Sequence, residues 1–408
     1  MTERFDVVIV GAGHGGAQAA AALRQHQFTG TIALVSDDPE LPYERPPLSK
    51  EYLAGDRAFE RILLRPAGFW AERSIELRPG HRVTAVDAAA HEVRLAEGST
   101  LGYGALVWAA GGAPRRLACS GHDLGGVHTI RSRADVDALR SEVGATDRAV
   151  VIGGGTIGLE SAAGLRKLGL AVTLLEAQDR VLSRIAAPPL SRWFESEHRA
   201  HGVDLRLGAR VACLEGSNGR VTGVRLDDGE LLPTALVIAG IGITPSVGPL
   251  LAAGARGDDG VLVDLQGKTS LPDVYALGDC AAHPNVHAHG ATVRLESVQN
   301  ATDMATIVAR ALTGSSERYE ALPWFWSNQY DVRLQTIGLS VGHDEVLVRG
   351  SLDARSFSLV YLRAGRVIAL DCVNAARDYV QGKALIVSGR EVDRGQLADP
   401  SVPLKSLA

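Results

Sequence analysis

Two apolar runs along the chain each lead into a turn rich in glycine. Residues 5–10 read Phe-Asp-Val-Val-Ile-Val and are followed by Gly-Ala-Gly-His-Gly-Gly. Residues 149–152 read Ala-Val-Val-Ile and are followed by Gly-Gly-Gly-Thr-Ile-Gly. Such a run is typical of a buried strand, and the small apolar residues at 17–23 are typical of a helix packed closely on a sheet. We therefore predict two strand–turn–helix units.

The same plan of strands follows both units. In each copy, two short alternating runs are followed by a turn at glycine and by an apolar run that itself ends in glycine. These runs cover 82–87, 91–95 and 105–111 in the first copy and 210–214, 221–226 and 235–240 in the second. We interpret each copy as a βαβ start, a small antiparallel insert and a returning strand.

The final part of the chain has a different pattern. Residues 333–338, 357–361 and 366–370 alternate between apolar and polar positions, and 375–388 follow a helical pattern. We predict antiparallel strands with a helix behind them. The predicted fold class is α/β, with two Rossmann-like dinucleotide-binding domains and a small α+β C-terminal domain.

The glycine turns have the chemistry of a pyrophosphate site. The first glycine makes a tight turn, the second lets the backbone approach the phosphates, and the third lets the helix pack on the strand. An acid follows the next apolar run in each copy, Asp37 in the first and Glu176 in the second, where it can accept ribose hydroxyl hydrogen bonds. Two bound dinucleotides are expected. The alternative is that one copy is scaffold alone.

Two further segments carry candidate chemistry. Prolines stiffen the loop at 41–50, where Ser49 can cap a helix that begins near Lys50. In this loop Arg45 and Lys50 either face phosphates or an electron-rich ring, or belong to an ordinary crossover. Downstream, Asp279 follows a predicted buried strand, at the sheet edge where open parallel sheets bind ligands.

Composition and charge set limits on function. The 408 residues are 46% hydrophobic and 22% charged, which is enough for two or three domains with their own cores. The net charge of −5 argues against general nucleic-acid binding. The sequence has neither a membrane-spanning apolar run nor room for a signal peptide before the first strand, so we expect a cytoplasmic protein that binds no membrane.

Cysteine and histidine spacing argues against metal chemistry. Cys119, Cys213, Cys280 and Cys372 form no Cys-x-x-Cys motif, so we expect neither an iron–sulfur cluster nor a redox dithiol within the chain. Electron transfer then requires a bound organic cofactor and a separate acceptor. The histidines at 283, 287 and 289 are irregularly spaced beside proline and glycine, which favours a polar loop over a metal site.

Taken together, these motifs resemble those of a known family. It is similar to the FAD-dependent NADH:ferredoxin reductases of oxygenase systems, the putidaredoxin, rubredoxin and Rieske-dioxygenase ferredoxin reductases, which are glutathione-reductase-like flavoproteins. Asn328 and Ala110 depart from the family pattern, where aspartate and threonine are commoner. The resemblance covers essentially the whole chain and is carried by residues 43–50, 153–160, 276–280, 296–301 and 324–329.

The resemblance implies positions for both nucleotides. FAD would contact residues of the first copy and some later ones, namely Gly11, Gly13, Gly15, Asp37, Arg45, Lys50, Val83, Arg131, Asp279, Val298 and Trp326. NADH would contact residues of the second copy and the segment after it, namely Gly155, Ile157, Glu160, Glu176, Arg184, Gly242 and Glu296. Glu176 would repel a 2′-phosphate and favour NADH over NADPH, although Arg180 and Arg184 lie nearby.

The resemblance also implies a domain plan and catalytic residues. Residues 1–111 and 245–318 would form the FAD-binding domain, 112–244 the NADH-binding domain and 319–408 the C-terminal domain. Lys50 and Glu160 would form a buried catalytic pair beside the flavin; the alternative is two solvated charges at helix ends. Trp326 would shield the flavin, or else serve packing alone.

The implied activity is electron transfer from NADH through FAD to a ferredoxin-type iron–sulfur protein that feeds a cytochrome P450 or a Rieske dioxygenase. A nicotinamide gives two electrons as hydride, whereas the acceptor takes one at a time, and a flavin can connect the two. The acceptor would bind transiently to a monomer or weak dimer. The alternatives are an NADH oxidase, a monodehydroascorbate reductase or a flavin-bound redox-signalling protein. The oxidase and disulfide-reductase branches would need a redox cysteine near 37–50, where this chain has none.

Overall fold

The computed structural model describes residues 2–408, so Met1, the first residue of the predicted FAD-binding domain, lies outside the described residues. The chain forms two compact units and passes between them five times. Two of these passages lie in β7 (Gly112–Pro114) and β16 (Ile243–Pro245). The first unit comprises Met1–Arg45, Phe59–Ala113 and Thr244–Phe325, and the second comprises Pro46–Ala58, Pro114–Ile243 and Trp326–Ala408. The assignment of a cofactor to each segment stays a prediction.

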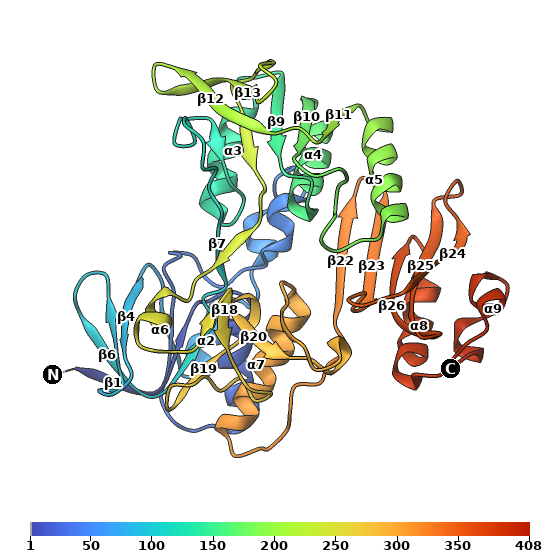
Figure 1. The fold of residues 1–408 in the computed structure, drawn as a ribbon. Helices are drawn as coiled ribbons and strands as arrows, with labels where there is room; N and C mark the ends of the chain where they lie inside the picture. The colour runs from blue at the N-terminus through green and yellow to red at the C-terminus, as the bar shows by residue number, and fades with distance from the viewer. Residues whose placement is uncertain (1) are drawn as a thin grey trace. The chain divides into compact units, whose positions relative to one another are not determined.

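The first unit is built on a mixed sheet in the order β3-β2-β1-β6-β5-β4, with β19 beside β6 (Figure 1). β1, β2, β3, β6 and β19 run parallel, and β4 and β5 form the predicted antiparallel insert. Parallel strands are covered on both faces, which explains why Val8 and Ile9 are 0% exposed. The bounds are β1 (Glu3–Val10), β2 (Ile32–Val35), β3 (Ile75–Arg78), β4 (Val83–Asp87), β5 (Glu92–Leu95), β6 (Thr100–Trp108) and β19 (Val274–Ala276).

Helices and a smaller sheet complete the first unit. α1 and α7 pack against each other, and Gln18 of α1 donates to Thr306 of α7 at 3.4 Å. The small sheet has the order β17-β18-β20-β21. The bounds are α1 (His14–Gln25), α2 (Gly68–Glu72), α6 (Gly248–Ala252), α7 (Val298–Leu312), β17 (Gly257–Asp258), β18 (Gly260–Leu262), β20 (Ala281–Pro284) and β21 (Thr292–Arg294), with 3-10 turns at Phe59–Ile62, Gly278–Cys280 and Val286–Ala288.

The second unit repeats the nucleotide-binding plan. Its parallel sheet has the order β11-β10-β9-β15-β8, and the predicted insert is the three-stranded sheet β12-β13-β14. An apolar cluster that includes Val150, Leu175 and Val224 joins the sheet to the insert. The bounds are β8 (Val127–His128), α3 (Arg133–Val143), β9 (Arg148–Ile152), α4 (Thr156–Lys167), β10 (Ala171–Glu176), α5 (Pro188–Ala200), β11 (Val203–Leu207), β12 (Val211–Ser217), β13 (Arg220–Leu226), β14 (Leu231–Pro233) and β15 (Val237–Ala239).

The C-terminal part is an antiparallel sheet in the order β22-β23-β26-β25-β24, and α8 packs on β23 and β26 (Figure 1). The predicted strands and helix are confirmed, while β22 and β24 were not predicted as strands. The bounds are β22 (Trp324–Gln329), β23 (Val332–Gly338), β24 (Glu345–Ser351), β25 (Ser356–Arg363), β26 (Arg366–Val373), α8 (Ala376–Ser388) and α9 (Arg394–Ala398), with a 3-10 turn at Leu404–Ser406. The α/β class with an α+β C-terminal part is confirmed.

The proline-rich loop folds differently from our prediction. A 3-10 helix covers Pro46–Ser49, and hydrogen-bonded turns continue to Asp56, so a helix that begins near Lys50 is wrong. The physical reason is that Ser49 is already the last residue of this 3-10 helix and not a residue before a new one, and its hydroxyl donates to Glu160 of α4. Within residues 2–408, none of the helices is long and apolar enough to cross a membrane.

Candidate functional site

The first glycine turn excludes every larger side chain at two positions. Gly11 has φ +102°, and a Cβ there would lie 2.4 Å from the Ala109 carbonyl oxygen. A Cβ on Gly16 would lie 1.8 Å from the Gly11 carbonyl oxygen. Gly16 is therefore the residue that closes the turn. Gly15 was predicted in its place, although the motif spacing indicates Gly16.

The remaining glycines of this turn have different surroundings. A Cβ on Gly15 would meet Leu277 at 2.5 Å, so Gly15 lets α1 pack closely. Gly13 is the N-cap of α1, and within residues 2–408 no atom lies within 4 Å of the position of its Cβ. The positive end of α1 is therefore next to open space at Gly13. A helix N-terminus with free backbone N–H groups is an anion site.

The second glycine turn has the same geometry. Gly153 has φ +109°, and its Cβ would lie 2.5 Å from the Gly240 carbonyl oxygen, while a Cβ on Gly158 would lie 1.9 Å from that of Gly153. Gly155 is the N-cap of α4, and the space around the position of its Cβ is open to 4 Å among the described residues. Ile157 is 42% exposed in the first turn of α4. Both turns are thus shaped to hold an anionic group.

The two predicted ribose acids lie in different environments. Glu176 ends β10, where Oε2 accepts from the Gly154 N–H at 2.6 Å and Oε1 accepts from the Gln178 N–H at 2.8 Å, so the carboxylate is fixed on the glycine turn. Asp37 follows β2 and is exposed. The neighbouring Asp38, which was not predicted as a site residue, is the acid that accepts hydrogen bonds within the loop.

Asp38 fixes the start of the proline-rich loop. Its carboxylate accepts from the Tyr43 hydroxyl at 2.8 Å and from Arg45 Nη2 at 3.2 Å. The Arg45 guanidinium also lies 4.6 Å from the centre of the Tyr43 ring. The cation predicted to face a phosphate is therefore tied to an acid at the carboxyl end of β2, and the paired acids at 37 and 38 were the available sequence signal.

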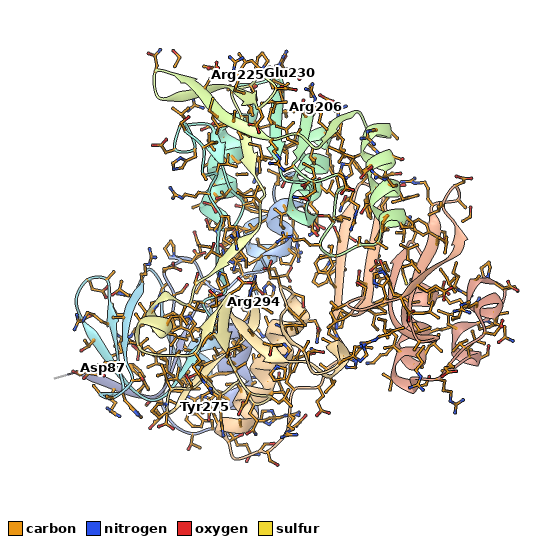
Figure 2. The ribbon with its side chains drawn as sticks, in the orientation of Figure 1. Asp87, Arg206, Arg225, Glu230, Tyr275 and Arg294 are labelled. Carbon is orange, nitrogen blue, oxygen red and sulfur yellow. The ribbon has the colours of Figure 1, made fainter. Side chains whose placement is uncertain are left out.

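A second group of predicted residues meets at the start of α7. Arg294 Nη1 donates to the Asp279 carbonyl oxygen at 2.9 Å and to Glu296 Oε1 at 2.8 Å, so it joins two residues assigned to different nucleotides. Arg294 is labelled in Figure 2. Val298 begins α7, and Ser297 caps it by accepting from the Asn300 N–H at 3.0 Å. The sequence carried no signal for Arg294, because strand and helix meet there through the fold.

Lys50 and Glu160 form a buried ion pair in the second unit. Lys50 Nζ lies 2.8 Å from Glu160 Oε2, and the two side chains are 11% and 1% exposed. The Ser49 hydroxyl donates to Oε2 at 2.6 Å, and the Ser327 hydroxyl of β22 donates to Oε1 at 2.6 Å. Both carboxylate oxygens are thus hydrogen-bonded, as a buried charge requires. The two residues are not solvated helix-end charges; a position beside a flavin stays a prediction.

The other predicted residues are distributed over both units. Arg184 is exposed, and its Nη2 lies 3.4 Å from the position of a Cβ on Gly242, so these two residues are neighbours. Arg131 precedes α3, where its backbone N–H donates to Asp135 at 3.0 Å. Val83 is buried at the start of β4 in the first unit, and Trp326 is half-buried in β22.

Burial keeps three of the cysteine thiols, those of Cys119, Cys280 and Cys372, in their protonated form. All four cysteines are free. Burial raises the pKa of Cys280 and of Cys372 to about 12, and burial also raises the pKa of Cys119. Because the thiolate is the reactive form, these thiols are poor nucleophiles near neutral pH.

Comparisons with known proteins agree with this geometry. A family model described as pyridine nucleotide-disulphide oxidoreductase matches residues 5–305, and one described as reductase C-terminal matches 324–408. A ferredoxin–NAD(P)(+) reductase from Sphingomonas sp. is 58% identical over 98% of this chain and 97% of its own length. The ferredoxin reductase subunit of 5,5'-dehydrodivanillate O-demethylase from Sphingobium sp. is 58% identical over 99% of this chain and 98% of its own.

A solved structure gives the same result for the fold. The reductase in a covalent putidaredoxin reductase–putidaredoxin complex superposes with a TM-score of 0.95 at 41% identity. The superposition covers 99% of this chain and 98% of that chain. The C-terminal sheet as well as both glycine turns therefore falls inside the matched region.

Proposed function

Because this chain belongs to the pyridine nucleotide-disulphide oxidoreductase family, we propose that it is a reductase that passes electrons from NADH through FAD to a ferredoxin-type iron–sulfur protein. The family membership and the cofactor classes, FAD and a nicotinamide nucleotide, are those that the sequence predicted. The downstream oxygenase, a transient complex with the acceptor, a monomeric or weakly dimeric state and a cytoplasmic location are part of this proposal.

The observation that carries the proposal is the repeated glycine turn. Gly13 and Gly155 each begin a helix next to open space, and each turn is followed by an acid after the next strand. We assign FAD to the first turn and NADH to the second. When bound, the flavin accepts hydride from the nicotinamide and releases electrons singly.

The residues around Glu160 support a role in orienting the flavin. The Lys50 ammonium is paired with the Glu160 carboxylate. One oxygen of that carboxylate accepts from the Ser49 hydroxyl and the other from the Ser327 hydroxyl. A buried cation held in this way does not need to reorganise when charge on a neighbouring ring changes. We propose that Lys50 presents this positive charge to the flavin, while Glu160, Ser49 and Ser327 hold it in position.

The second turn supports NADH over NADPH. Glu176 is fixed by two backbone N–H groups at the end of β10. An acid at this position of a dinucleotide-binding unit accepts from the ribose hydroxyls and repels a 2′-phosphate. Arg180, which could have accommodated that phosphate, donates to the Ala186 and Ser183 carbonyls and to the Ser191 hydroxyl. Arg184 is the remaining cation nearby. The net effect is that the Glu176 carboxylate is held in one position, where its negative charge disfavours NADPH.

The state of the cysteines opposes the two dithiol-based alternatives. A disulfide-reductase or oxidase reaction through a thiol needs a reactive thiolate, whereas burial raises the pKa of Cys119, Cys280 and Cys372.

Turnover tests the proposed function. The purified yellow protein is mixed with NADH and cytochrome c, with and without an added ferredoxin of the kind that serves oxygenases. We expect rapid cytochrome c reduction when ferredoxin is present. Hydrogen peroxide formed at the same rate without ferredoxin would identify an oxidase. A colourless protein that NADH does not reduce would contradict the proposal altogether.

A further inference from the structure

A buried hydrogen-bond chain connects the C-terminal sheet to the segment before α5. The Tyr361 hydroxyl of β25 donates to Asp371 Oδ2 of β26 at 2.5 Å. The other oxygen of Asp371 accepts from Thr336 of β23 at 2.8 Å. The Ala187 N–H donates to the Tyr361 oxygen at 3.0 Å. The chain thus ends on the N-cap residue of α5, which belongs to the nucleotide-binding half of the second unit.

The strand register places these side chains on one face of the sheet. Asp371 pairs with Thr336 on one side and with Leu359 on the other. Tyr361 is two residues beyond Leu359, so its side chain points to the same face as that of Asp371. Tyr361 is 0% exposed and Asp371 2% exposed. Burial raises the pKa of Tyr361, which therefore remains a neutral donor.

The segment that this chain holds runs from Glu176 to Ala187. Its first end is fixed on the glycine turn, because Glu176 Oε2 accepts from the Gly154 N–H at 2.6 Å. Inside the segment, the Leu182 N–H donates to the Gly154 carbonyl oxygen at 2.9 Å. Leu182 itself has φ +54°, a conformation that is costly for a branched side chain. Such a backbone persists only where its surroundings hold it from several sides. The hydrogen bond from the Ala187 N–H to Tyr361 stabilises this segment from the C-terminal sheet, outside the nucleotide-binding half.

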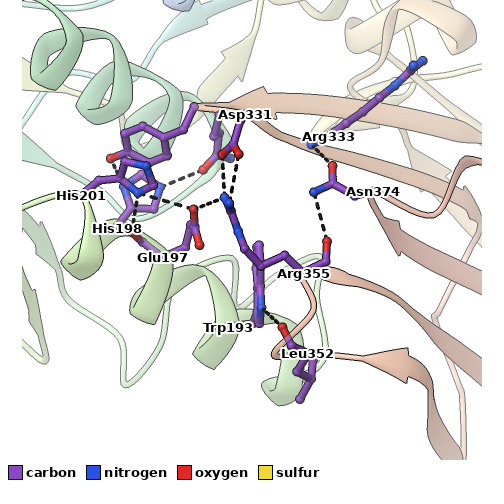
Figure 3. A network of polar contacts seen from close by, with 11 residues as sticks. Trp193, Glu197, His198, His201, Asp331, Arg333, Leu352, Arg355 and Asn374 are labelled. Atoms are coloured by element: carbon purple, nitrogen blue, oxygen red, sulfur yellow. Dashed lines mark hydrogen bonds and ion pairs between the residues drawn. The ribbon is translucent and has the colours of Figure 1, made fainter.

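Arg184 lies inside this held segment. It is flanked by Leu182 and by Ala187, and its guanidinium lies beside Gly242, the residue before β16. The position of Arg184 therefore depends on both ends of the segment. The far end of α5 is also tied to the C-terminal part, where Arg355 donates to Glu197 at 2.5 Å and His198 is bonded to Gln329 at 2.8 Å (Figure 3).

We propose that Tyr361, oriented by Asp371, is a positioning residue of the nicotinamide-nucleotide site: it holds the segment at 177–187 so that Arg184 meets the bound nucleotide. This inference rests on the proposed function. The C-terminal sheet then contributes to NADH affinity without contacting NADH. Loss of the Tyr361 hydroxyl leaves the Ala187 N–H without its partner and frees one end of the segment.

The test separates binding from hydride transfer. Flavin reduction is measured in stopped flow over a range of NADH concentrations for wild type, Y361F and R184Q, with Y379F in α8 as the matched control. For Y361F we expect the apparent Kd for NADH to rise about five-fold, the effect of one lost hydrogen bond, with a limiting rate within about two-fold of wild type. Y379F is expected to behave as wild type.

The double variant shows whether Tyr361 acts through Arg184. If it does, R184Q/Y361F binds NADH no more weakly than R184Q alone. An apparent Kd for Y361F equal to that of Y379F would overturn the inference, and so would effects of R184Q and Y361F that multiply. If Y361F does not fold, T336V replaces it: about two-fold weaker NADH binding supports the inference and unchanged binding overturns it.

The proposed function and the positioning role of Tyr361 are contradicted by different results. A wild-type protein that NADH does not reduce contradicts the proposed function. A wild-type protein that NADH reduces, in which R184Q weakens binding and Y361F does not, contradicts the positioning role of Tyr361 alone.

Discussion

At the scale of single residues, burial decides what a charge can do. Glu160 is 2% exposed, yet both its oxygens are hydrogen-bonded and its charge is paired with Lys50. Lys167, on the same helix, pairs with Asp56 at 2.6 Å while its side chain is 60% exposed. Water and salt screen the second pair, so we expect it to contribute little.

These two lysines give a matched prediction. K50M removes the cation from a buried carboxylate, and we expect the rate of flavin reduction by NADH to fall by at least ten-fold. The free energy of unfolding should fall by about 3 kcal/mol, because a buried charge is left unpaired. K167M should change the free energy of unfolding by less than about 1 kcal/mol and leave the rate unchanged. Stopped-flow absorbance and urea denaturation measure both; an unaltered rate in K50M would remove Lys50 from the reaction.

At the scale of elements, α5 carries a buried histidine that links it to β22 and to the turn after it. His198 is 0% exposed; its Nε2 lies 2.8 Å from Gln329 Oε1, and its Nδ1 lies 3.1 Å from the Tyr330 hydroxyl. These partners suit a neutral ring that donates from Nε2 and accepts at Nδ1. Burial lowers the pKa of His198 to about 4.

This shift predicts an acid sensitivity with a definite sign. Below pH 6.5 the unfolded chain binds a proton at His198 that the folded chain does not bind until about pH 4. The folded protein therefore loses the stability that His198 contributes as the pH falls through this window. Between pH 7.5 and 5.5 the loss amounts to about 1.4 kcal/mol. H198Q should lack it, as measured by urea denaturation at both pH values. Equal pH dependence in wild type and H198Q would contradict the prediction.

The comparison with H198Q is needed because Asp371 changes the pH dependence of stability in the opposite direction. Burial raises its pKa from 3.8 to about 6, so its contribution favours the folded state at low pH and is lost as the pH rises through that window. Both wild type and H198Q contain Asp371, so its contribution cancels in the difference between them.

The end of the chain depends on a single arginine of β24. Arg349 is 2% exposed and donates to Asp378 of α8 at 2.9 Å, to the Leu397 carbonyl at 3.1 Å and to the Val402 carbonyl at 2.7 Å. The planar guanidinium serves several acceptors at once, which an ammonium group cannot do in the same geometry.

R349K should therefore not be conservative. We expect a loss of about 2 to 4 kcal/mol in the free energy of unfolding and faster proteolysis after residue 390, because several buried carbonyls lose their donor. R366K, at a position in β26 where the side chain is 58% exposed, is the control and should behave as wild type. Limited proteolysis with mass spectrometry locates the cleavage; protection equal to that of R366K would refute the role of Arg349.

At the scale of the whole molecule, the chain uses one nucleotide-binding plan twice. The two N-cap glycines, Gly13 and Gly155, allow the two predicted cofactor sites to be tested separately. A Cβ on Gly13 or Gly155 meets no atom of residues 2–408 within 4 Å, so an added methyl group leaves the fold intact but enters the space assigned to a pyrophosphate. G13A should be purified folded but without FAD. G155A should keep its yellow colour and bind NADH at least ten-fold more weakly.

Absorbance spectra and NADH titrations measure these outcomes, and circular dichroism reports the fold. G11A is the contrasting control: its Cβ would lie 2.4 Å from a carbonyl oxygen at a positive φ, so the variant should be destabilised whatever it binds. A G13A protein that retains FAD while G155A loses it would reverse the assignment of the two turns.

Local pattern in the sequence was enough for the elements and for the turns between strand and helix. Apolar runs, alternation and glycine spacing depend on neighbours a few residues apart, so they predicted both glycine turns, the antiparallel inserts, three C-terminal strands and α8. β22 and β24 were missed as strands. The Trp-Phe-Trp run of β22 lacks regular alternation, and β24 lies on an edge where few positions are buried.

Only the tertiary structure decided which polar groups meet. Ser49 and Ser327 reach Glu160 from 111 and 167 residues away in the sequence, and Tyr361 reaches Ala187 from 174 residues away. Arg294 likewise reaches the Asp279 carbonyl oxygen from 15 residues away. Hydrophobic periodicity specifies which face of an element is buried, but not which distant polar atom lies opposite it. That pairing depends on the packing of whole elements, where each buried donor must find an acceptor.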